Sequence, residues 1–492
     1  MNYFIGADLG TSALKLLLTD ESGSILKEVN RNYPISFPAP GWSEQFPDDW
    51  WGAFISGTAE LISGIDPRNV TAIGIGGQMH GLVILDKDGK VVRPAILWND
   101  GRTGEETDYL NNMIGRQTLS EETGNIAFAG FTAPKLLWLR KNEPDSFARI
   151  SKLMLPKDYI TYRLTGRHCT DYSDASGTLL FDVRHRCWSE RMLEICRINR
   201  SMMPDLLESC DVAGRLSPSV ADILGLSPET KVVAGAGDNA AAAIGTGTVG
   251  NGSCNISLGT SGTVFISSDT FSVDRLNSLH SFCHADGGYH LMGCILSAAS
   301  CNKWFCENIL RTDDYPYEQA AITDEMLGNN HVFFLPYLMG ERSPHCDTDA
   351  RGTFIGLRMD SSRSDMLLAV LEGVAFAIRD CVEVASFGGT SIQSSSICGG
   401  GARSELWLRI ICNVLDIKIR TVATEQGPGF GAAILAAVGA GAFRSVDEAV
   451  SFLVKKDREF VPDPVIAARY REKYNKFRKI YPSVKDLFKI IK

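Results

Sequence analysis

No two cysteines in this chain are separated by only two residues, although 13 cysteines are spread over its 492 positions. Such closely spaced pairs are the usual mark of a structural zinc site. The count is odd, and several cysteines lie in apolar surroundings, as Cys294 does within residues 291–296. These features predict reduced, buried cysteines in a cytoplasmic protein, without disulfides or structural zinc.

Long hydrophobic runs and an excess of positive charge are also missing. The chain begins directly with a strand-like segment, which predicts no signal peptide. The apolar stretch at residues 432–443 is short and rich in Ala and Gly, so it predicts a buried helix and not a membrane span. With 49 basic and 58 acidic residues the net charge is −9, which argues against nucleic acid or an anionic membrane as a general partner.

One basic segment departs from this composition, the tail at residues 469–492. Its aromatic residues recur at helical spacing, at Tyr470, Tyr474, Phe477 and Tyr481. The spacing predicts an amphipathic helix that packs by its aromatic face and exposes its basic face. Contact with a membrane or a nucleic acid is the alternative.

Two short segments nearly repeat each other at a distance of about half the chain. Residues 4–12 read Phe-Ile-Gly-Ala-Asp-Leu-Gly-Thr-Ser, residues 257–262 read Ser-Leu-Gly-Thr-Ser-Gly, and an apolar run follows each. Each pattern predicts two strands joined by a Gly-Thr-Ser turn. Glycine allows close backbone approach, and hydroxyl and backbone N–H groups donate to phosphate oxygens. Two facing hairpins of this kind predict a two-lobed protein that uses ATP.

The length of the chain exceeds one ordinary core, so we expect two large domains. Strand-like and helical runs alternate in both halves, which predicts an α/β architecture. The glycine-rich stretch at residues 245–252 lies just before the second hairpin and acts either as a hinge or as a simple loop. We therefore predict an N-terminal domain of residues 1–246 and a C-terminal domain of residues 247–492.

Two aspartates stand at the ends of predicted strands beside glycine-rich turns. Asp8 adjoins the first Gly-Thr-Ser turn, where a carboxylate can hold Mg²⁺ near a transferred phosphate, directly or through water; an Asx turn is the alternative. Asp238 follows Val-Val-Ala-Gly-Ala-Gly at residues 232–237 and begins an Ala-rich helix. It can accept a proton from a substrate hydroxyl, or it can simply cap the helix. A helix N-terminus favours the carboxylate form that proton acceptance needs.

Three further polar segments carry candidate ligand contacts. Residues 399–404, Gly-Gly-Gly-Ala-Arg-Ser, lead into a predicted helix and let a flat or phosphorylated ligand approach the backbone. They are not a G-x-G-x-x-G fingerprint, and the chain has no G-x-x-x-x-G-K-[ST] loop, so a nicotinamide enzyme or a P-loop kinase is poorly supported. Residues 76–81, Gly-Gly-Gln-Met-His-Gly, favour a small polar ligand, although a lone histidine is more often structural. Residues 98–102, Trp-Asn-Asp-Gly-Arg, suit a hydroxyl-rich ligand or equally a surface turn.

Taken together, these motifs resemble the FGGY family of carbohydrate kinases from Tyr3 to about Ala440. The agreement extends over many ordered blocks, which makes chance agreement implausible. Besides the segments above, these include Trp-Ser-Glu-Gln at 42–45, Leu-Pro-Lys-Asp-Tyr at 155–159, Ser-Asp-Ala-Ser-Gly-Thr at 173–178, Gly-Asp-Asn-Ala at 237–240 and Gly-Glu-Arg-Ser-Pro-His at 340–345. The resemblance implies two ribonuclease-H-like domains of the actin-type ATPase fold, with a cleft between them.

The resemblance also implies roles for individual residues. Asp238 matches the base that accepts the sugar hydroxyl proton, and Asp8 matches the Mg²⁺-associated carboxylate. Met79, His80, Asp238 and Asn239 match sugar contacts. The phosphate hairpins are matched by Thr11, Ser12, Thr260 and Gly262, and the adenosine-side loop by Gly400, Gly401 and Arg403. One departure is Pro-Gly-Phe-Gly-Ala-Ala at residues 428–433, where relatives carry Pro-Ala-Leu-Gly-Ala-Ala; there Phe430 is expected to narrow or restack the segment beside the nucleotide, and Gly429 to loosen the helix start.

The implied activity is ATP-dependent phosphorylation of a ketopentose, with D-xylulose at its 5-hydroxyl as the first expectation. The alternatives are a kinase for ribulose, fuculose or gluconate, and a non-kinase ATPase on the same fold that responds to a sugar or nucleotide. ATP, Mg²⁺ and a small sugar are the expected ligands, without nucleic acid or membrane. The sequence leaves the oligomeric state open, a homodimer included.

Overall fold

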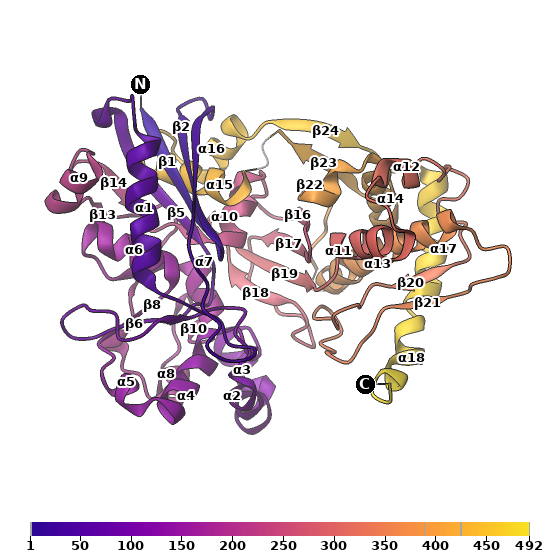
Figure 1. The fold of residues 1–492 in the computed structure, drawn as a ribbon, viewed down its shortest axis with the longest axis horizontal. Helices are drawn as coiled ribbons and strands as arrows, with labels where there is room; N and C mark the ends of the chain where they lie inside the picture. Colours follow the sequence, from indigo (N-terminus) through magenta and orange to yellow (C-terminus); the bar gives the residue numbers. More distant parts are fainter. Residues whose placement is uncertain (1, 388, 424–425, 492) are drawn as a thin grey trace.

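Two lobes, each built on a mixed β-sheet, make up the molecule (Figure 1). This computed structural model describes residues 2–387, 389–423 and 426–491. The first sheet runs in the order β13 (Val212–Arg215), β14 (Lys231–Val233), β5 (Val70–Gly77), β1 (Tyr3–Leu9), β2 (Ala13–Asp20) and β3 (Ile25–Asn32). The second sheet runs in the order β18 (His280–Cys283), β19 (Tyr289–Ile295), β17 (Gly262–Ser268), β16 (Ser253–Leu258), β22 (Ser394–Cys398), β23 (Lys418–Val422) and β24 (Lys456–Phe460).

The two sheets share one topology around their hairpins. In the first, β1 pairs antiparallel with β2 and parallel with β5. In the second, β16 pairs antiparallel with β17 and parallel with β22. The repeated sequence segments therefore form the same hairpin at the same place in each sheet. The predicted α/β fold with two ribonuclease-H-like domains is confirmed by this arrangement.

Helix α15 (Gly427–Ala440) crosses from the second half of the sequence to the first sheet, where Figure 1 shows it beside β1 and β5. Its backbone lies directly on the strands, because a Cβ on Gly6 would meet the Gly429 carbonyl oxygen at 2.0 Å. It also packs on α10 (Asp238–Gly245), and it is the buried helix expected at residues 432–443. The boundary between residues 246 and 247 stays a prediction, with α10 ending at Gly245 and β16 beginning at Ser253.

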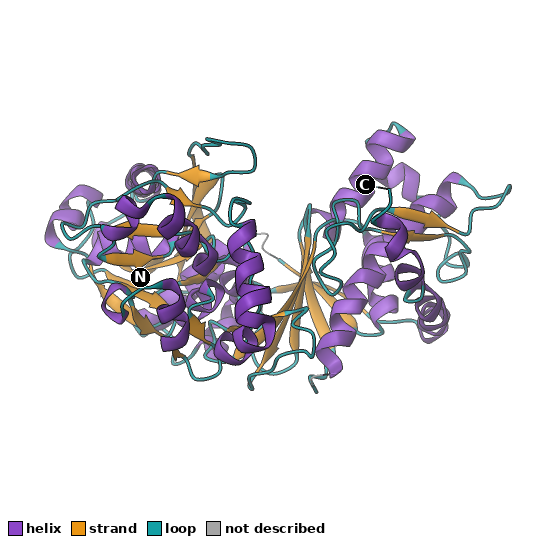
Figure 2. Ribbon diagram, turned by 90° about the horizontal axis from the view of Figure 1, so that it is seen from below, coloured by secondary structure: helices purple, strands orange, loops and turns teal. Residues whose placement is uncertain are grey.

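A helical region on the first sheet's lobe meets the second sheet through β18. Its core joins Met79 and Phe131 of the first lobe to Phe282 of β18. Asn125 and Ser281 exchange backbone-to-side-chain hydrogen bonds of 2.8 and 3.1 Å, and the Cys283 N–H donates to Ser176 Oγ at 3.0 Å. Figure 2 shows the strands of the second sheet between the helices of the two lobes. The lobes are thus joined at β18 by polar and apolar contacts.

The basic tail packs as two helices, α17 (Pro464–Phe477) and α18 (Ile480–Phe488), on the second lobe. Tyr470, Tyr474 and Phe477 are buried in the core that also contains Trp407 of α14 (Glu405–Leu415) and Phe376 of α13 (Arg363–Phe387). The predicted amphipathic packing face is therefore present, divided between two helices. Across the described residues, no helix combines the length and apolar character that crossing a bilayer requires.

Candidate active site

Asp8 and Asp238 line one cavity of about 460 Å³, which we call the carboxylate cavity. Asp8 lies near the carboxyl end of β1, and Asp238 is the first residue of α10, directly after the short strand β15 (Ala236–Gly237). Both β1 and β15 run parallel to β5, so their carboxyl ends meet at one edge of the sheet. Ligands of α/β sheets bind at this edge.

The turns of both hairpins reach the carboxylate cavity. Gly10 from the first hairpin and Gly259, Thr260 and Ser261 from the second are among its lining residues. The other predicted phosphate residues lie close by but do not line it. The Thr11 hydroxyl accepts a 2.9 Å hydrogen bond from the Trp98 indole, and Gly262 is buried at the start of β17. Ser12 is exposed in the first turn.

Burial raises the pKa of both carboxyls in the cavity. The pKa of Asp8 rises to about 6, because burial outweighs the attraction of the Lys15 ammonium. The pKa of Asp238 rises to about 7 through burial and the nearby negative charge of Asp8, against a lowering by the Asn239 backbone N–H. A carboxyl with a pKa near neutrality is suited to accept a proton at physiological pH.

One oxygen of the Asp238 carboxyl is already engaged. Asp238 Oδ1 accepts from the backbone N–H of Asn239 at 2.7 Å and from Asn239 Nδ2 at 3.0 Å. Gly237, not Asp238, occupies the cap position of α10. The Asp238 carboxylate nevertheless accepts from a backbone N–H of the first helical turn, so the capping alternative stands beside proton acceptance. Oδ2 can receive a substrate hydroxyl.

Met79 packs against Gly237, the residue before Asp238, and His80 packs against Gly177; neither side chain lines the carboxylate cavity. A Cβ on Gly237 would come within 3.0 Å of Met79 Sδ, and one on Gly177 would come within 2.5 Å of His80 Nδ1. His80 Nδ1 is 2.7 Å from the Gly177 carbonyl oxygen. Burial, together with the positive charges of Lys135 and Arg342, lowers the pKa of His80 to about 3, so the ring is neutral. With Nδ1 donating to the carbonyl, Nε2 is an acceptor for a ligand hydroxyl.

The Trp-Asn-Asp-Gly-Arg segment divides into buried and exposed parts. Asp100 and Arg102 form a buried ion pair of 2.7 Å, and Asp100 also accepts from the Ser43 backbone N–H. The Arg102 guanidinium stacks 3.8 Å above the Trp42 ring. These two charged residues therefore hold the local structure. Trp98 and Asn99 are exposed and remain candidates for ligand contact.

A second, larger cavity of about 950 Å³ adjoins the carboxylate cavity. It contains all three predicted adenosine-side residues, Gly400, Gly401 and Arg403. Its walls are the start of α14 and the helices α11 (Ala299–Trp304) and α12 (Tyr315–Gln319). The two cavities share Gly259 and Thr260 of the second hairpin turn. A ligand with a flat end and a phosphate end can thus extend from one cavity into the other.

Phe430 lies away from both cavities. It is buried in the core formed by α10, α15, α16 (Val446–Leu453) and the first sheet, and it lines neither cavity. An ideal Cβ on Gly429 would lie 3.0 Å from Leu17 Cδ1, so the glycine allows the helix to pack closely on the sheet. Phe430 therefore does not narrow either cavity, contrary to the expectation from the sequence.

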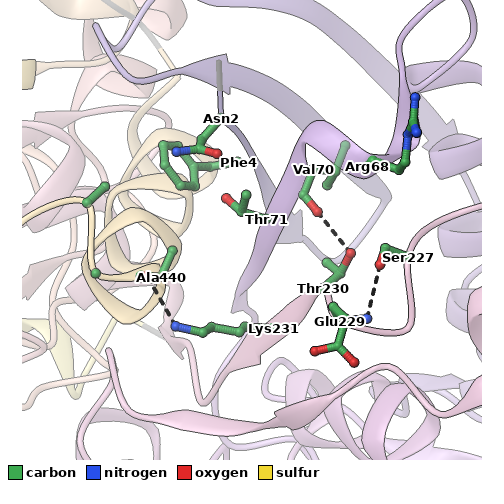
Figure 3. A pocket seen from close by; sticks show the side chains of 12 residues that line it. Asn2, Phe4, Arg68, Val70, Thr71, Ser227, Glu229, Thr230, Lys231 and Ala440 are labelled. Atoms are coloured by element: carbon green, nitrogen blue, oxygen red, sulfur yellow. Dashed lines mark hydrogen bonds between the residues drawn. The ribbon is translucent and has the colours of Figure 1, made fainter.

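A separate pocket of about 380 Å³ lies at the opposite end of the first sheet (Figure 3). Its lining includes Phe4, Val70 and Lys231, which stand at the amino ends of β1, β5 and β14. Lys231 Nζ donates to the carbonyls of Gly439 and Ala440 at the end of α15. Because the two carboxylates lie at the other end of these strands, this pocket is not part of the candidate site.

Several lining residues carry no recognisable signal in the sequence. Asn255 and Gly427 line the carboxylate cavity, and Tyr315 and Trp407 line the larger one. Asn255 lies on β16 of the second hairpin, and Gly427 reaches the site because α15 crosses to the first sheet. Tyr315 and Trp407 reach it because α12 and α14 meet beside the second hairpin. Such tertiary placement cannot be deduced from local pattern.

Two family models match the chain and cover most of it. Residues 3–245 match the N-terminal domain of the FGGY family of carbohydrate kinases, and residues 254–440 match its C-terminal domain. The matched segments include both hairpins, both carboxylates and the glycine loop at residues 399–404.

Among similar proteins, the xylulose kinase of Escherichia coli (strain K12) is 40% identical over 487 residues, covering 98% of this chain and 99% of that one. The crystal structure of a xyloylose kinase from Brucella ovis superposes with a TM-score of 0.93 at 38% identity, covering 99% and 100% of the two chains. A gluconate kinase from Lactobacillus acidophilus gives a TM-score of 0.94 at 26% identity, with both chains covered completely.

Proposed function

The chain belongs to the FGGY family of carbohydrate kinases, and from this premise we propose that it transfers the γ-phosphoryl group of ATP to the 5-hydroxyl of D-xylulose. The observation that carries the proposal is the shared turn at Gly259 and Thr260, which joins the larger cavity to the carboxylate cavity. A nucleotide seated in the larger cavity would direct its phosphates toward Asp8 and Asp238.

In the proposed reaction, Asp238 acts as the general base. The sugar 5-hydroxyl oxygen attacks the γ-phosphorus, the bond to the bridging oxygen breaks, ADP leaves and the hydroxyl proton passes to Asp238 Oδ2. Phosphoryl transfer depends mainly on positioning and charge neutralisation. Met79, His80 and Asn239 would hold the sugar, with His80 Nε2 accepting a hydrogen bond from one of its hydroxyls. Donors of the two hairpin turns would hold the phosphates.

A divalent cation fits the residues present. Asp8 and Asp238 are two carboxylates in one cavity. No cluster of three or more His, Cys, Asp or Glu side chains suited to a metal occurs among the described residues. Mg²⁺ characteristically takes one or two carboxylates and completes its shell with phosphate oxygens and water. We propose Asp8 as its protein ligand; the bound ion would supply charge neutralisation at the phosphates.

The choice of D-xylulose is supported by two relatives described above, the Escherichia coli protein and the Brucella ovis structure. Ribulose, fuculose and gluconate are the competing substrates, and the Lactobacillus acidophilus neighbour bears the name of a gluconate kinase. A non-kinase ATPase is disfavoured because Asp238 follows Gly237, which packs against the predicted sugar contact Met79, and because Asp238 does not line the larger cavity. We also propose a cytoplasmic location, supported by 13 free cysteines among the described residues.

The test is ADP release from Mg·ATP with a panel of D-xylulose, ribulose, fuculose, gluconate and glycerol. We expect the highest kcat/KM with D-xylulose and little release without a sugar. A higher kcat/KM with another member would contradict the choice of sugar and leave the family intact. Release that does not depend on any sugar would favour the ATPase alternative.

A further inference from the structure

The strand that leads to Asp238 is interrupted by an irregular turn. Beside β5, Val232 pairs with Ile73 and Ala236 pairs with Gly76, so the chain advances four positions where its partner advances three. The extra residue forms a β-bulge at Ala234 and Gly235, with Gly235 at φ +78°. An ideal Cβ on Gly235 would meet the Ile75 carbonyl oxygen at 2.0 Å. Bulges re-aim the side chains that follow them, and here the third residue after Gly235 is Asp238.

The backbone groups of this bulge lose their ladder partners and are satisfied in other ways. The N–H groups of Ala234 and Gly235 donate to the carbonyls of Asp211 and Ser209, at 2.9 and 3.0 Å. The Ala234 carbonyl accepts from Lys157 Nζ at 3.3 Å. The Gly237 N–H donates to Ser173 Oγ at 3.1 Å. The last bond holds the peptide between Ala236 and Gly237, and Gly237 is the residue before Asp238.

Ser173 and Lys157 belong to one buried polar network. Lys157 Nζ lies 2.6 Å from Asp158 Oδ1 and 2.9 Å from Asp171 Oδ1. Asp171 Oδ2 accepts from the hydroxyls of Ser173 and Ser209, and from the Ser173 backbone N–H at 2.8 Å. All these side chains are buried. Burial alone would lower the pKa of Lys157, but the surrounding carboxylates raise it above its ordinary value, so the ammonium stays charged.

The network contains more charged groups than are needed to hydrogen-bond the backbone of the bulge. Asp174 adds a third carboxyl, 3.8 Å from Lys157 Nζ, and burial raises its pKa well above the ordinary value despite Lys157. A buried ionic group is a weak source of stability, since burying it in low dielectric offsets much of the attraction. This network is costly to bury, and it is hydrogen-bonded to the backbone N–H of Gly237, the residue before the candidate base. A requirement to position that base explains it better than a contribution to stability does.

We propose that Ser173, oriented by Asp171 and Lys157, is a positioning residue for the reaction: its hydroxyl oxygen holds the Gly237 peptide and so fixes where Asp238 meets the substrate hydroxyl. This inference rests on the proposed function of Asp238. Ser173 touches neither substrate nor reacting atoms. It acts through the peptide bond between Ala236 and Gly237, one residue before Asp238.

The chain offers a matched control at Ser209. Both hydroxyls donate to Asp171 Oδ2 and both side chains are buried, but only Ser173 Oγ accepts from the Gly237 N–H. Ser173→Ala and Ser209→Ala therefore remove the same kind of hydrogen bond from the same carboxylate. They differ in the link to Asp238.

The experiment measures two quantities on both variants and the wild type. The first is amide hydrogen exchange of the peptide that spans residues 234–240, followed by mass spectrometry without ligand. The second is kcat and KM for D-xylulose. We expect faster exchange in Ser173→Ala alone. We also expect kcat to fall on the order of 10-fold or more in Ser173→Ala, since small displacements of catalytic groups cost this much, with a smaller change in KM. Ser209→Ala should stay within about twofold of wild type for kcat, because it retains the hydrogen bonds of Ser173 with Gly237 and of Lys157 with Ala234.

Equal exchange and equal kcat in the two serine variants would overturn the proposal. So would a fall in kcat for Ser173→Ala that is matched by Ser209→Ala, since loss of Asp171 partners would then explain it. A difference in exchange supports the positioning link even if no sugar stimulates ADP release by the wild type; that second result would contradict the proposed function separately.

Discussion

At the residue scale, the feature that most needs explanation is a pair of buried carboxyls in one cavity. Burial disfavours the charged form of a carboxyl, so it raises the pKa and reduces the stability of the unliganded protein at neutral pH. Burial raises the pKa of Asp8 to about 6, and burial together with the charge of Asp8 raises the pKa of Asp238 to about 7. Carboxyls with a raised pKa that line a cavity are candidates for a functional site.

The two carboxyls should respond differently to replacement. Asp238→Asn keeps the size of the side chain but removes the proton acceptor, so kcat should fall on the order of 10²-fold or more while D-xylulose still binds. Asp8→Asn should weaken the Mg²⁺-dependent step, so raising Mg²⁺ should recover part of its rate and none of the rate of Asp238→Asn. Steady-state kinetics of both variants across a Mg²⁺ series measures this. Near-normal turnover of Asp238→Asn would remove the base from the mechanism.

The pH dependence of kcat/KM for D-xylulose should report Asp238. The base must be ionised, and burial together with Asp8 raises its pKa to about 7, so kcat/KM should fall as pH drops through about 7. In Asp8→Asn the like charge is gone, so this fall should move to lower pH.

Asp380 supplies the matched control for that profile. Burial raises its pKa to about 7 as well, despite the hydrogen bond from Tyr474, but it lies on α13 outside the carboxylate cavity. Asp380→Asn should leave the midpoint unchanged. The opposite result, in which the midpoint of the kcat/KM profile moves in Asp380→Asn and stays fixed in Asp8→Asn, would show that Asp238 is not the titrating group.

Sequence patterns located both carboxyls but not their surroundings. Asp8 and Asp238 stand out because each follows an apolar strand and precedes glycine or a helix. The roles of Asp100 and Arg102 were open in the sequence, and their buried ion pair answers the question only through contacts with Ser43 and Trp42. Side chains separated by tens of residues give no local signal of such pairing.

At the element scale, the packing of α10 against α15 positions the site, because Asp238 begins α10 and the first residues of α15 line the carboxylate cavity. The helices approach so closely that a Cβ on Gly431 would lie 1.8 Å from the Ala241 carbonyl oxygen. Gly431→Ala should therefore separate the helices and lower the free energy of unfolding by about 2 kcal/mol or more, because backbone must move. Thermal or denaturant unfolding measures this, and ADP release should fall with it.

Gly52→Ala is the matched control for Gly431→Ala. Gly52 lies in the interior of α1 (Pro47–Leu61), is exposed, and has nothing within 4 Å of an added Cβ. Alanine is the better helix former by about 0.5–1 kcal/mol, so this change should be neutral or stabilising. Equal destabilisation by both substitutions would show that helix contact is not the cause.

The hairpins, α10 and the α15 segment could all be predicted as elements from the sequence, because their apolar runs and glycines are local signals. The placement of α15 against the first sheet could not. It depends on Gly6 and Gly74, which are far from α15 in the sequence and pair with each other in β1 and β5. Together they leave room for the helix backbone, and this fit exists only once the sheet has formed. The bulge before Asp238 was missed for the same reason, since its partners Lys157 and Ser173 are remote in the chain.

At the scale of the whole molecule, the site is divided between the lobes. The carboxylates belong to the first lobe and the larger cavity to the second, and they meet at the second hairpin turn. The contacts of Asn125 with Ser281 and of Ser176 with Cys283 join the lobes at β18 and can serve as a pivot. Closure on both ligands would exclude water, the competing phosphoryl acceptor.

Small-angle scattering should detect this closure. With D-xylulose and a non-hydrolysable ATP analogue together, the radius of gyration should be smaller than in the unliganded protein. Each ligand alone provides the comparison, and we expect the largest decrease with both. A profile that does not change on adding both ligands would count against a closing mechanism.

The central claim is that one site, shared by the two lobes, holds ATP and the sugar around Asp238. The most direct measurement is a crystal structure of the complex with D-xylulose and a non-hydrolysable ATP analogue. The account predicts adenine in the larger cavity, the triphosphate between Gly10 and Thr260, and the sugar 5-hydroxyl oxygen within about 3 Å of Asp238 Oδ2. A nucleotide bound elsewhere, or a sugar whose 5-hydroxyl lies away from Asp238, would contradict it.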